Sequence, residues 1–551
     1  MKTGLKLALP TIVIALMASA CQKKIEADLI VHNGVLYTVD SVFSVKQAMA
    51  IKEDRIVSIG TDEDILSRYS ATVEVDAKGN TILPGFVDAH VHFFWYGESL
   101  FTVDLTGCKT FDEVIERVKA FAKMNPDEKW IKGRGWDQNE FPDKSFPTNK
   151  TLNELFPRTP VALYRVDGHS VLVNEAALNR AGIKPGLKIS GGELVTENGM
   201  LTGVLIDNAM KLFDASLPIP TKEESTKWLR AGQSKCMEQG LTALTDCGLD
   251  FEAVELLDSL QRAGIIDLQM YVMLSDKKKN YDRFLAAGPY QTDKLRVGGF
   301  KIFGDGALGS RGACMLAPYN DQSGYHGFLL NTPEHFDSVA QVLSKTKFQM
   351  CTHAIGDSAN RVIASIYNKY LHGKNDRRWR IEHAQIVNKN DFKLFGMASI
   401  IPSVQPTAAI SDMDWAETRI GKERMSGGYA YQDLLKQNDW IALGTDFPID
   451  DMNPIRTFYS AVARKDSDGN PDEGFQPENA LTREQALRGI TLWAARAGFM
   501  EKEIGSLEVG KRADFILLDR DLMKINHSSI LDTKVLATYI DGEKKFSQEG
   551  W

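Results

Sequence analysis

Through the middle of the chain, from about residue 83 to residue 500, short apolar runs alternate with longer stretches patterned like amphipathic helices. Apolar runs of four to eight residues between such helices are typical of a parallel sheet with crossover connections. Eight runs of this kind predict an α/β fold, a (β/α)8 TIM barrel. The candidate strands are residues 82–92, 241–247, 268–274, 298–303, 348–353, 379–383, 399–405 and 440–446.

The first two candidate strands are separated by about 150 residues. A connection within a barrel is normally far shorter than this. We therefore expect an inserted subdomain after the first barrel strand, at about residues 100–225.

The two ends of the chain show a different pattern from the middle. Residues 25–82 and 503–551 alternate short β-prone runs with turn signals such as Asn-Gly and Asp. We expect the two ends to build one sheet domain together.

The first 20 residues have the features of an export signal. Lys2 and Lys6 precede the apolar residues 7–17, and the small residues 18–20 follow, directly before Cys21. The apolar stretch is too short to span a bilayer comfortably. The segment resembles a bacterial lipoprotein signal in which Cys21 is lipidated, and the alternative is a simple secretory signal with an incidental cysteine. Either form predicts an exported protein, and lipidation predicts a membrane anchor facing the periplasm or the cell exterior.

The composition is that of an ordinary globular protein. Of the 551 residues, 43% are hydrophobic and 25% charged, which is enough to bury a core, and the chain is too long for one small domain. The formal net charge is -8 and no basic run occurs, so nucleic acid is not an expected partner. Five cysteines follow Cys21 at irregular spacings, so no disulfide framework is expected.

Histidines and an aspartate close several of the candidate strands. His90 and His92 flank one residue at the end of the first strand, so strand alternation sends both imidazoles to the same face. His353, His383 and Asp446 end three later strands. Barrel enzymes gather their active sites at these strand ends. The set predicts a metal site, whereas any one of these histidines alone is more simply a core residue.

Lys301 lies near the end of the fourth candidate strand, among apolar neighbours. A lysine in the barrel mouth repels a metal cation unless it is deprotonated or carbamylated by CO2 to a bridging carboxylate. The alternative is a solvated lysine without a metal role.

Five segments spread along the chain carry a resemblance to a known family. They read Leu83-Pro-Gly-Phe-Val-Asp-Ala-His-Val-His, Lys301-Ile-Phe-Gly-Asp-Gly-Ala-Leu-Gly-Ser-Arg, Thr352-His-Ala-Ile-Gly-Asp, Ile381-Glu-His-Ala-Gln and Leu443-Gly-Thr-Asp-Phe-Pro. In this ordered set the chain resembles the amidohydrolase superfamily, in its family 3 branch, which includes N-substituted formamide deformylases. The resemblance implies a barrel over residues 83–500 beside a composite β-sandwich of residues 25–82 and 503–551.

The same resemblance implies a divalent metal, usually zinc, with one or two ions per chain. His90 and His92 would bind one ion with Asp446, and His353 and His383 a second. Carbamylated Lys301 would bridge the two. The implied reaction is hydrolysis of a non-peptide carbon-nitrogen bond in a small-molecule amide by a metal-activated hydroxide.

Asp446 is the candidate proton shuttle for that reaction, and a ligand without a proton role is its alternative. Other substrates stay open, namely cyclic amides, esters, lactones or a deaminated ring. A catalytically inactive solute-binding lipoprotein is the alternative from another class. The oligomeric state is also open, with a homodimer as one alternative.

Further residues are second candidates for the pocket. His169, within the predicted insertion, is placed either as an oxyanion donor or as a residue that orients the subdomain. Asp305 and Arg311 either line the pocket or form a local salt bridge, and His326 lies in a Gly-rich loop that would cover the mouth.

A turn after Gly133 would present Trp136 and Asp137 to the substrate, although a buried tryptophan is commoner. Trp95, Tyr96 and Phe141 would add to an aromatic pocket, or fill the interface between barrel and insertion.

Overall fold

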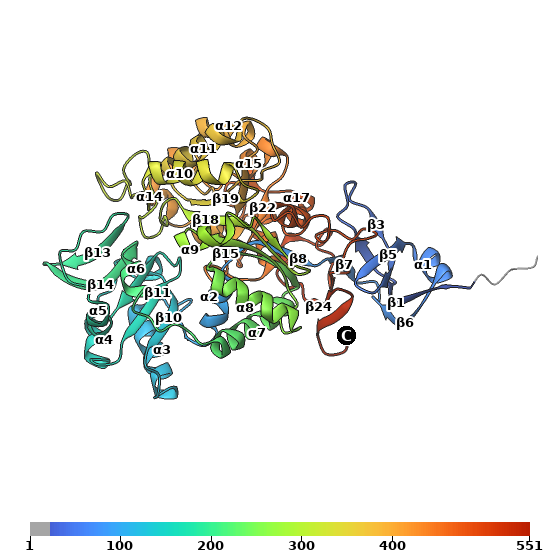
Figure 1. The fold of residues 1–551 in the computed structure, drawn as a ribbon, viewed down its shortest axis with the longest axis horizontal. Coiled ribbons are helices and arrows are strands. Elements are labelled where there is room, and N and C mark those ends of the chain that lie inside the picture. Colours follow the sequence, from blue (N-terminus) through green and yellow to red (C-terminus); the bar gives the residue numbers. More distant parts are fainter. Residues whose placement is uncertain (1–22) are drawn as a thin grey trace, which may run out of the picture.

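The computed structural model describes residues 23–551. The predicted signal segment and Cys21 therefore lie outside the described residues. The described chain forms a central barrel, a sheet-containing insertion on one side of it and sheets built from the chain ends on the other (Figure 1). No helix between residues 23 and 551 combines the length and the apolar character that crossing a membrane requires.

Eight strands of the central sheet run parallel and follow one another in chain order, which confirms the predicted (β/α)8 barrel. Two backbone hydrogen bonds close the ring, from Asp446 N to His90 O (2.8 Å) and from His92 N to Phe447 O (2.9 Å). The barrel strands are β8 (Phe86–Val91), β15 (Leu241–Leu249), β16 (Gln269–Ser275), β18 (Leu295–Phe303), β19 (Gln349–Ala354), β20 (Arg380–His383), β21 (Ile401–Val404) and β22 (Ala442–Leu443).

The first predicted strand, residues 82–92, is two strands. β7 (Thr81–Pro84) belongs to a terminal sheet and β8 belongs to the barrel, with Gly85 between them. Gly85 N donates to Asp514 O at 3.0 Å, and a Cβ atom at Gly85 would lie 2.2 Å from Thr242 Oγ1 on β15. The chain changes sheets where only glycine fits against the neighbouring strand.

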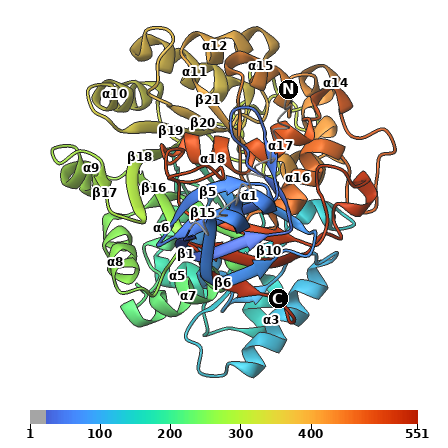
Figure 2. The same ribbon diagram turned by 90° about the vertical axis from the view of Figure 1, so that its right-hand side faces the viewer.

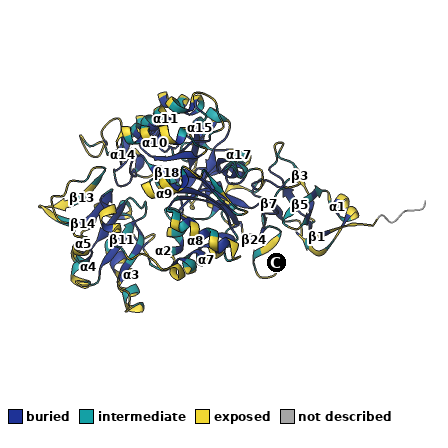
Figure 3. Cartoon of the chain, in the orientation of Figure 1, coloured by how far each residue is buried: buried dark blue, intermediate teal, exposed yellow. Residues whose placement is uncertain are grey.

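The outer helices bury one face on the barrel and expose the other. In α10 (Pro333–Ser344) the buried residues are Phe336, Val339, Ala340 and Leu343, a helical spacing of three and four. Thr332 caps this helix by accepting from the His335 N–H. Figure 3 shows the same division, with buried barrel strands and exposed outer helix faces.

The insertion between β8 and β15 begins with α2 (Phe93–Ser99) and continues into a second sheet with its own hydrophobic core. The strand order of this sheet is β13-β14-β12-β11-β10-β9. Its strands are β9 (Val103–Asp104), β10 (Ile131–Trp136), β11 (Val161–Arg165), β12 (Ser170–Val173), β13 (Gly192–Glu197) and β14 (Met200–Asp207).

The two chain ends meet in one six-stranded sheet, where β7 pairs antiparallel with β23 (Phe515–Leu518). A second, four-stranded sheet is built from β1 (Ile25–His32), β4 (Ala48–Lys52), β5 (Arg55–Gly60) and β6 (Tyr69–Asp76). Thr538 Oγ1 donates to Met237 O at 2.7 Å, just before β15 begins. The terminal sheets thus pack at the amino-terminal ends of the barrel strands, in front of the ring of helices in Figure 2.

Candidate metal centre at the barrel mouth

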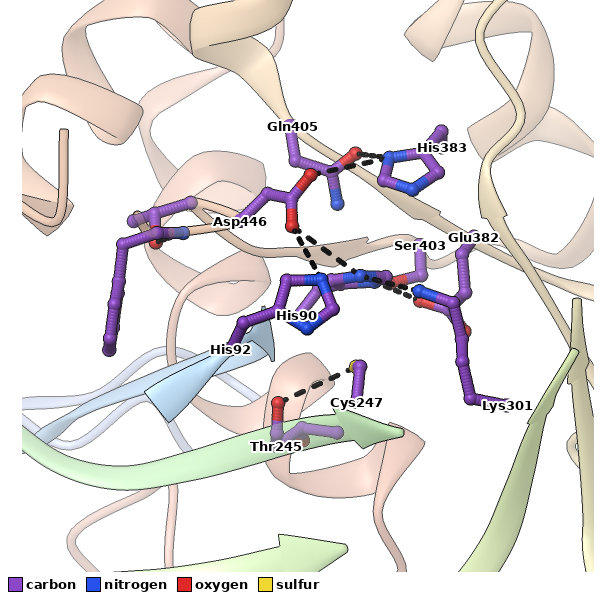
Figure 4. A network of polar contacts seen from close by, with 12 residues as sticks. His90, His92, Thr245, Cys247, Lys301, Glu382, His383, Ser403, Gln405 and Asp446 are labelled. Carbon is purple, nitrogen blue, oxygen red and sulfur yellow. Dashed lines mark hydrogen bonds and ion pairs between the residues drawn. The ribbon is translucent and has the colours of Figure 1, made fainter. Parts of the chain in front are cut away.

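The predicted ligands converge at the barrel mouth, which is the end where the barrel strands finish. His90, His92 and Asp446 come from the first and last strand ends, and Figure 4 shows Asp446 facing both imidazoles. His383 and Asp446 have positive φ angles of 71° and 63°. Such left-handed backbone at residues other than glycine is costly and is characteristic of functional sites. The remaining members of the cluster are Lys301 on β18 and His353 on β19.

The polar atoms of this cluster lie close to one another. Asp446 Oδ1 is 3.6 Å from His90 Nε2 and 3.4 Å from His92 Nε2, and Asp446 Oδ2 is 3.9 Å from His383 Nδ1. His90, His383 and Asp446 each offer a ligand atom within 4.8 Å of the other two. The His353 and His383 ring centroids are 4.5 Å apart. These side chains therefore lie close enough together to bind a small ion jointly.

The donor set fits a divalent metal. His353 Nε2 and Asp446 Oδ1 are buried and have no hydrogen-bond partner in the described part of the chain. Burial lowers the pKa of His92 to about 4 and that of His383 to about 3, so both imidazoles are neutral and keep a lone pair. Burial opposes ionisation of Asp446, but the surrounding imidazoles, His90 foremost, hold its pKa below the usual range. A cation would satisfy both orphaned atoms.

Two further side chains orient the histidines. His90 Nδ1 donates to Glu382 Oε2 at 2.6 Å, and Arg380 Nη2 in turn donates to the same oxygen at 2.8 Å. His383 Nδ1 donates to Gln405 Oε1 at 2.7 Å. Each bond places the ring proton on Nδ1 and leaves the lone pair on Nε2. The sequence reasoning missed these residues, although Glu382 directly precedes His383 and shares a strand face with Arg380.

Lys301 lies inside the cluster. Its side chain is 1% exposed, which contradicts the solvated alternative. Nζ is 3.0 Å from His90 Nε2, and no carboxylate within residues 23–551 forms an ion pair with it.

The insertion adds His169 to this group. His169 Nδ1 donates to Asp207 Oδ1 at 2.5 Å, and the His169 ring lies 4.9 Å from that of His353. Burial lowers the pKa of His169, but the Asp207 carboxylate outweighs it and raises the pKa overall. Asp207 lies 38 residues further along the chain, and no local motif marks it.

Trp136 does not lie at the mouth, so the prediction that it faces the substrate is wrong. Its side chain is 1% exposed in the insertion core, and Nε1 donates to Leu163 O at 2.7 Å. Phe141 is buried in the same core. Asp137 caps a short 3-10 helix and pairs with Arg165, while Trp95 is exposed.

Three more predicted pocket residues have local structural partners. Asp305 is fully buried and accepts from the backbone N–H groups of Ile355 (2.9 Å), Gly356 (2.8 Å) and Cys314 (2.8 Å). It thus ties two loops together, and burial raises its pKa to about 7. Asp305 Oδ1 also lies 3.7 Å from His353 Nε2, so Asp305 adjoins the metal cluster, and its place in the pocket stays a prediction.

Arg311 pairs with Asp321 at 2.8 Å, which is the local salt bridge that the sequence left as an alternative. His326 Nδ1 donates to Met315 O at 3.2 Å. Both side chains therefore have a partner close by in the chain, and the covering role of the His326 loop stays a prediction.

A parallel barrel with histidines and an aspartate gathered at its mouth is typical of the class of metal-dependent hydrolases. The model of the amidohydrolase family matches residues 73–544, and the chain belongs to this family, as the sequence resemblance indicated. Protein LONG AFTER FAR-RED 3 of Arabidopsis thaliana is 32% identical over 540 residues, covering 95% of this chain and 92% of the relative.

Two other comparisons bear on the chemistry. N-substituted formamide deformylase of Arthrobacter pascens is 26% identical, covering 95% of this chain and 99% of the relative. The crystal structure of an uncharacterized metal-dependent hydrolase from Pyrococcus horikoshii superposes with a TM-score of 0.74 at 27% identity, covering 91% of this chain and 99% of that one.

Proposed function

We propose that this protein hydrolyses a non-peptide carbon-nitrogen bond in a small-molecule amide and uses zinc to do so. The observation that carries the proposal is the cluster of neutral imidazoles and Asp446 with two orphaned ligand atoms, His353 Nε2 and Asp446 Oδ1. Imidazole and carboxylate ligands suit zinc. The similarity to a formamide deformylase supports an amide substrate.

Zinc would be held by His90, His92 and Asp446, and a second ion by His353 and His383, with carbamylated Lys301 as bridge. His383 of the second set offers a ligand atom within 4.8 Å of those of His90 and Asp446 of the first, so the two sets lie side by side. When bound, a divalent metal lowers the pKa of a coordinated water and polarises the scissile carbonyl.

The side chains of the protein supply proton transfer and charge stabilisation. Asp446 is ionised and has a second carboxylate oxygen besides the one that would bind the metal, so it can take a proton from the attacking water. As the C–N bond breaks, the same carboxyl returns that proton to the leaving nitrogen, and acid and amine are released. The Asp207 carboxylate favours the protonated form of His169, and in that form His169 can donate through its other nitrogen to the oxyanion.

The reacting bond and the role of Asp446 are tested together by substrate turnover. Purified protein supplied with zinc and bicarbonate is assayed on N-formyl amides, N-acyl amides, cyclic amides, esters and lactones. Asp446→Asn is expected to lower amide turnover by about 10²–10⁴-fold, because the proton carrier is lost. Asp282→Asn is the matched control, since Asp282 is exposed and pairs with Lys278 on the same helix.

Three results would contradict the proposal in different ways. Unchanged turnover in Asp446→Asn would contradict the role of Asp446 as proton shuttle. Hydrolysis of esters or lactones but not of amides would show that the protein cleaves another kind of bond. Binding of these compounds without any turnover would favour the solute-binding protein.

A further inference from the structure

An arginine of the insertion has no partner for its charge. Arg134 on β10 forms no ion pair with any carboxylate of residues 23–551, and its Nε is buried without a hydrogen bond. The one hydrogen bond of its side chain within these residues runs from Nη2 to Val166 O at 3.1 Å. Arg165 and Arg419 nearby are both paired with aspartates. No carboxylate of the described residues therefore neutralises the charge of Arg134.

Arg134 shares the barrel mouth with the metal cluster. The Trp95 ring stacks on the His92 ring at 4.5 Å and 20°, and Arg134 Cζ lies 5.8 Å from the Trp95 centroid. Trp95 is 46% exposed, so it forms an accessible wall between the predicted ligand and the guanidinium. Burial lowers the pKa of Arg134 to about 10, which keeps it cationic at neutral pH.

The space beside the guanidinium is kept free by glycine. Gly168 has φ of +70°, and a Cβ there would lie 3.2 Å from Arg134 Nη2 and 3.5 Å from Nη1. It would also lie 3.4 Å from Ile449 Cδ1. A side chain at this position would cover both terminal nitrogens, and glycine leaves them uncovered.

We propose that Arg134 binds a carboxylate of the substrate, so that the substrates are amides carrying a carboxylate. The planar guanidinium offers two parallel N–H donors that match a carboxylate, and a bound anion would compensate the unpaired, half-buried charge. Trp95 would contact the part of the substrate between the carboxylate and the reacting bond. This inference rests on the proposed amide hydrolysis for the reacting bond.

A purely structural role for Arg134 makes a different prediction. Its bond to Val166 O supports the turn that carries His169. If that were its only role, substitution would slow every substrate equally. An anion site instead predicts a loss confined to carboxylated substrates.

The test compares N-formylphenylalanine with N-formylphenethylamine, which differ only in the carboxylate, and the corresponding N-acetyl pair. The wild-type protein is expected to prefer the acid. Arg134→Met is expected to lower kcat/KM for the acid by about 10- to 100-fold and to leave the neutral member within about twofold. Arg134→Lys should retain part of the preference. Arg283→Gln is the matched control, because Arg283 is exposed and pairs with Glu255.

An equal loss for both members, or a preference for the neutral one, would overturn the inference and leave amide hydrolysis standing. Turnover of other amides, with no turnover of the N-formyl pair or the N-acetyl pair, would also overturn the inference. Absence of all amide turnover would instead overturn the proposed function. Calorimetric binding of N-acetylphenylalanine still reports on Arg134 in that event, and equal affinity of wild type and Arg134→Met would overturn the anion site.

Discussion

Single hydrogen bonds set the direction of two histidines beside Asp446. His90 depends on Glu382, and His383 depends on the side-chain oxygen of Gln405. Glu382 is itself held by Arg380, and the guanidinium keeps the pKa of this carboxyl below its usual range despite burial. Removing Glu382 would therefore also leave Arg380 unpaired, whereas Gln405 has no such second partner among the charged groups of residues 23–551.

Gln405→Leu is expected to weaken metal binding by about 10- to 100-fold, because His383 loses the acceptor that fixes its tautomer. The measurement is zinc competition against a chelator of known affinity. Gln437→Leu is the matched control, since Gln437 donates within its own helix, to Asp433 O. Equal zinc affinity in Gln405→Leu and the control would show that this hydrogen bond does not orient a ligand.

At the scale of the element, a bulge in β10 decides which side chains reach the mouth. Simple alternation along the strand puts Arg134 and Trp136 on one face. The register with β11 shifts between these two residues, where Gly135 has φ of +112°. The bulge turns Trp136 into the insertion core and leaves Arg134 toward the mouth.

Trp136→Ala is therefore expected to destabilise the protein and to leave its metal content unchanged. Loss of a fully buried tryptophan costs about 3–5 kcal/mol in the free energy of unfolding. Urea unfolding followed by circular dichroism measures it, with the exposed Trp95→Ala as comparison. A stability loss no larger than that of Trp95→Ala would contradict the core placement.

The sequence predicted the barrel and the ligand cluster because both rest on local signals. A short apolar run and the histidine that ends it are contiguous, as at His353 and His383, and parallel strands bring such ends together. The switch at Gly85 was missed because the apolar run continues unbroken from one sheet into the other. Asp207 and Gln405 were missed because only the folded topology brings them to their histidines.

At the scale of the whole molecule, the barrel lies between the insertion and the terminal sheets, and only the insertion adds side chains to the mouth. The insertion brings His169 and Arg134 to the mouth, and the terminal sheets pack at the opposite end of the strands (Figure 1). Export and lipidation at Cys21 stay predictions from the sequence.

The central claim is that the histidines at the strand ends form a metal centre, and metal content tests it most directly. The protein is expressed with zinc and bicarbonate, purified and measured by elemental analysis. The expected result is about two zinc ions per chain, held by imidazole, Asp446 and a bridging Lys301 carbamate. One zinc ion per chain would support the metal centre and contradict the bridging carbamate. Protein that stays free of metal under these conditions would contradict the claim.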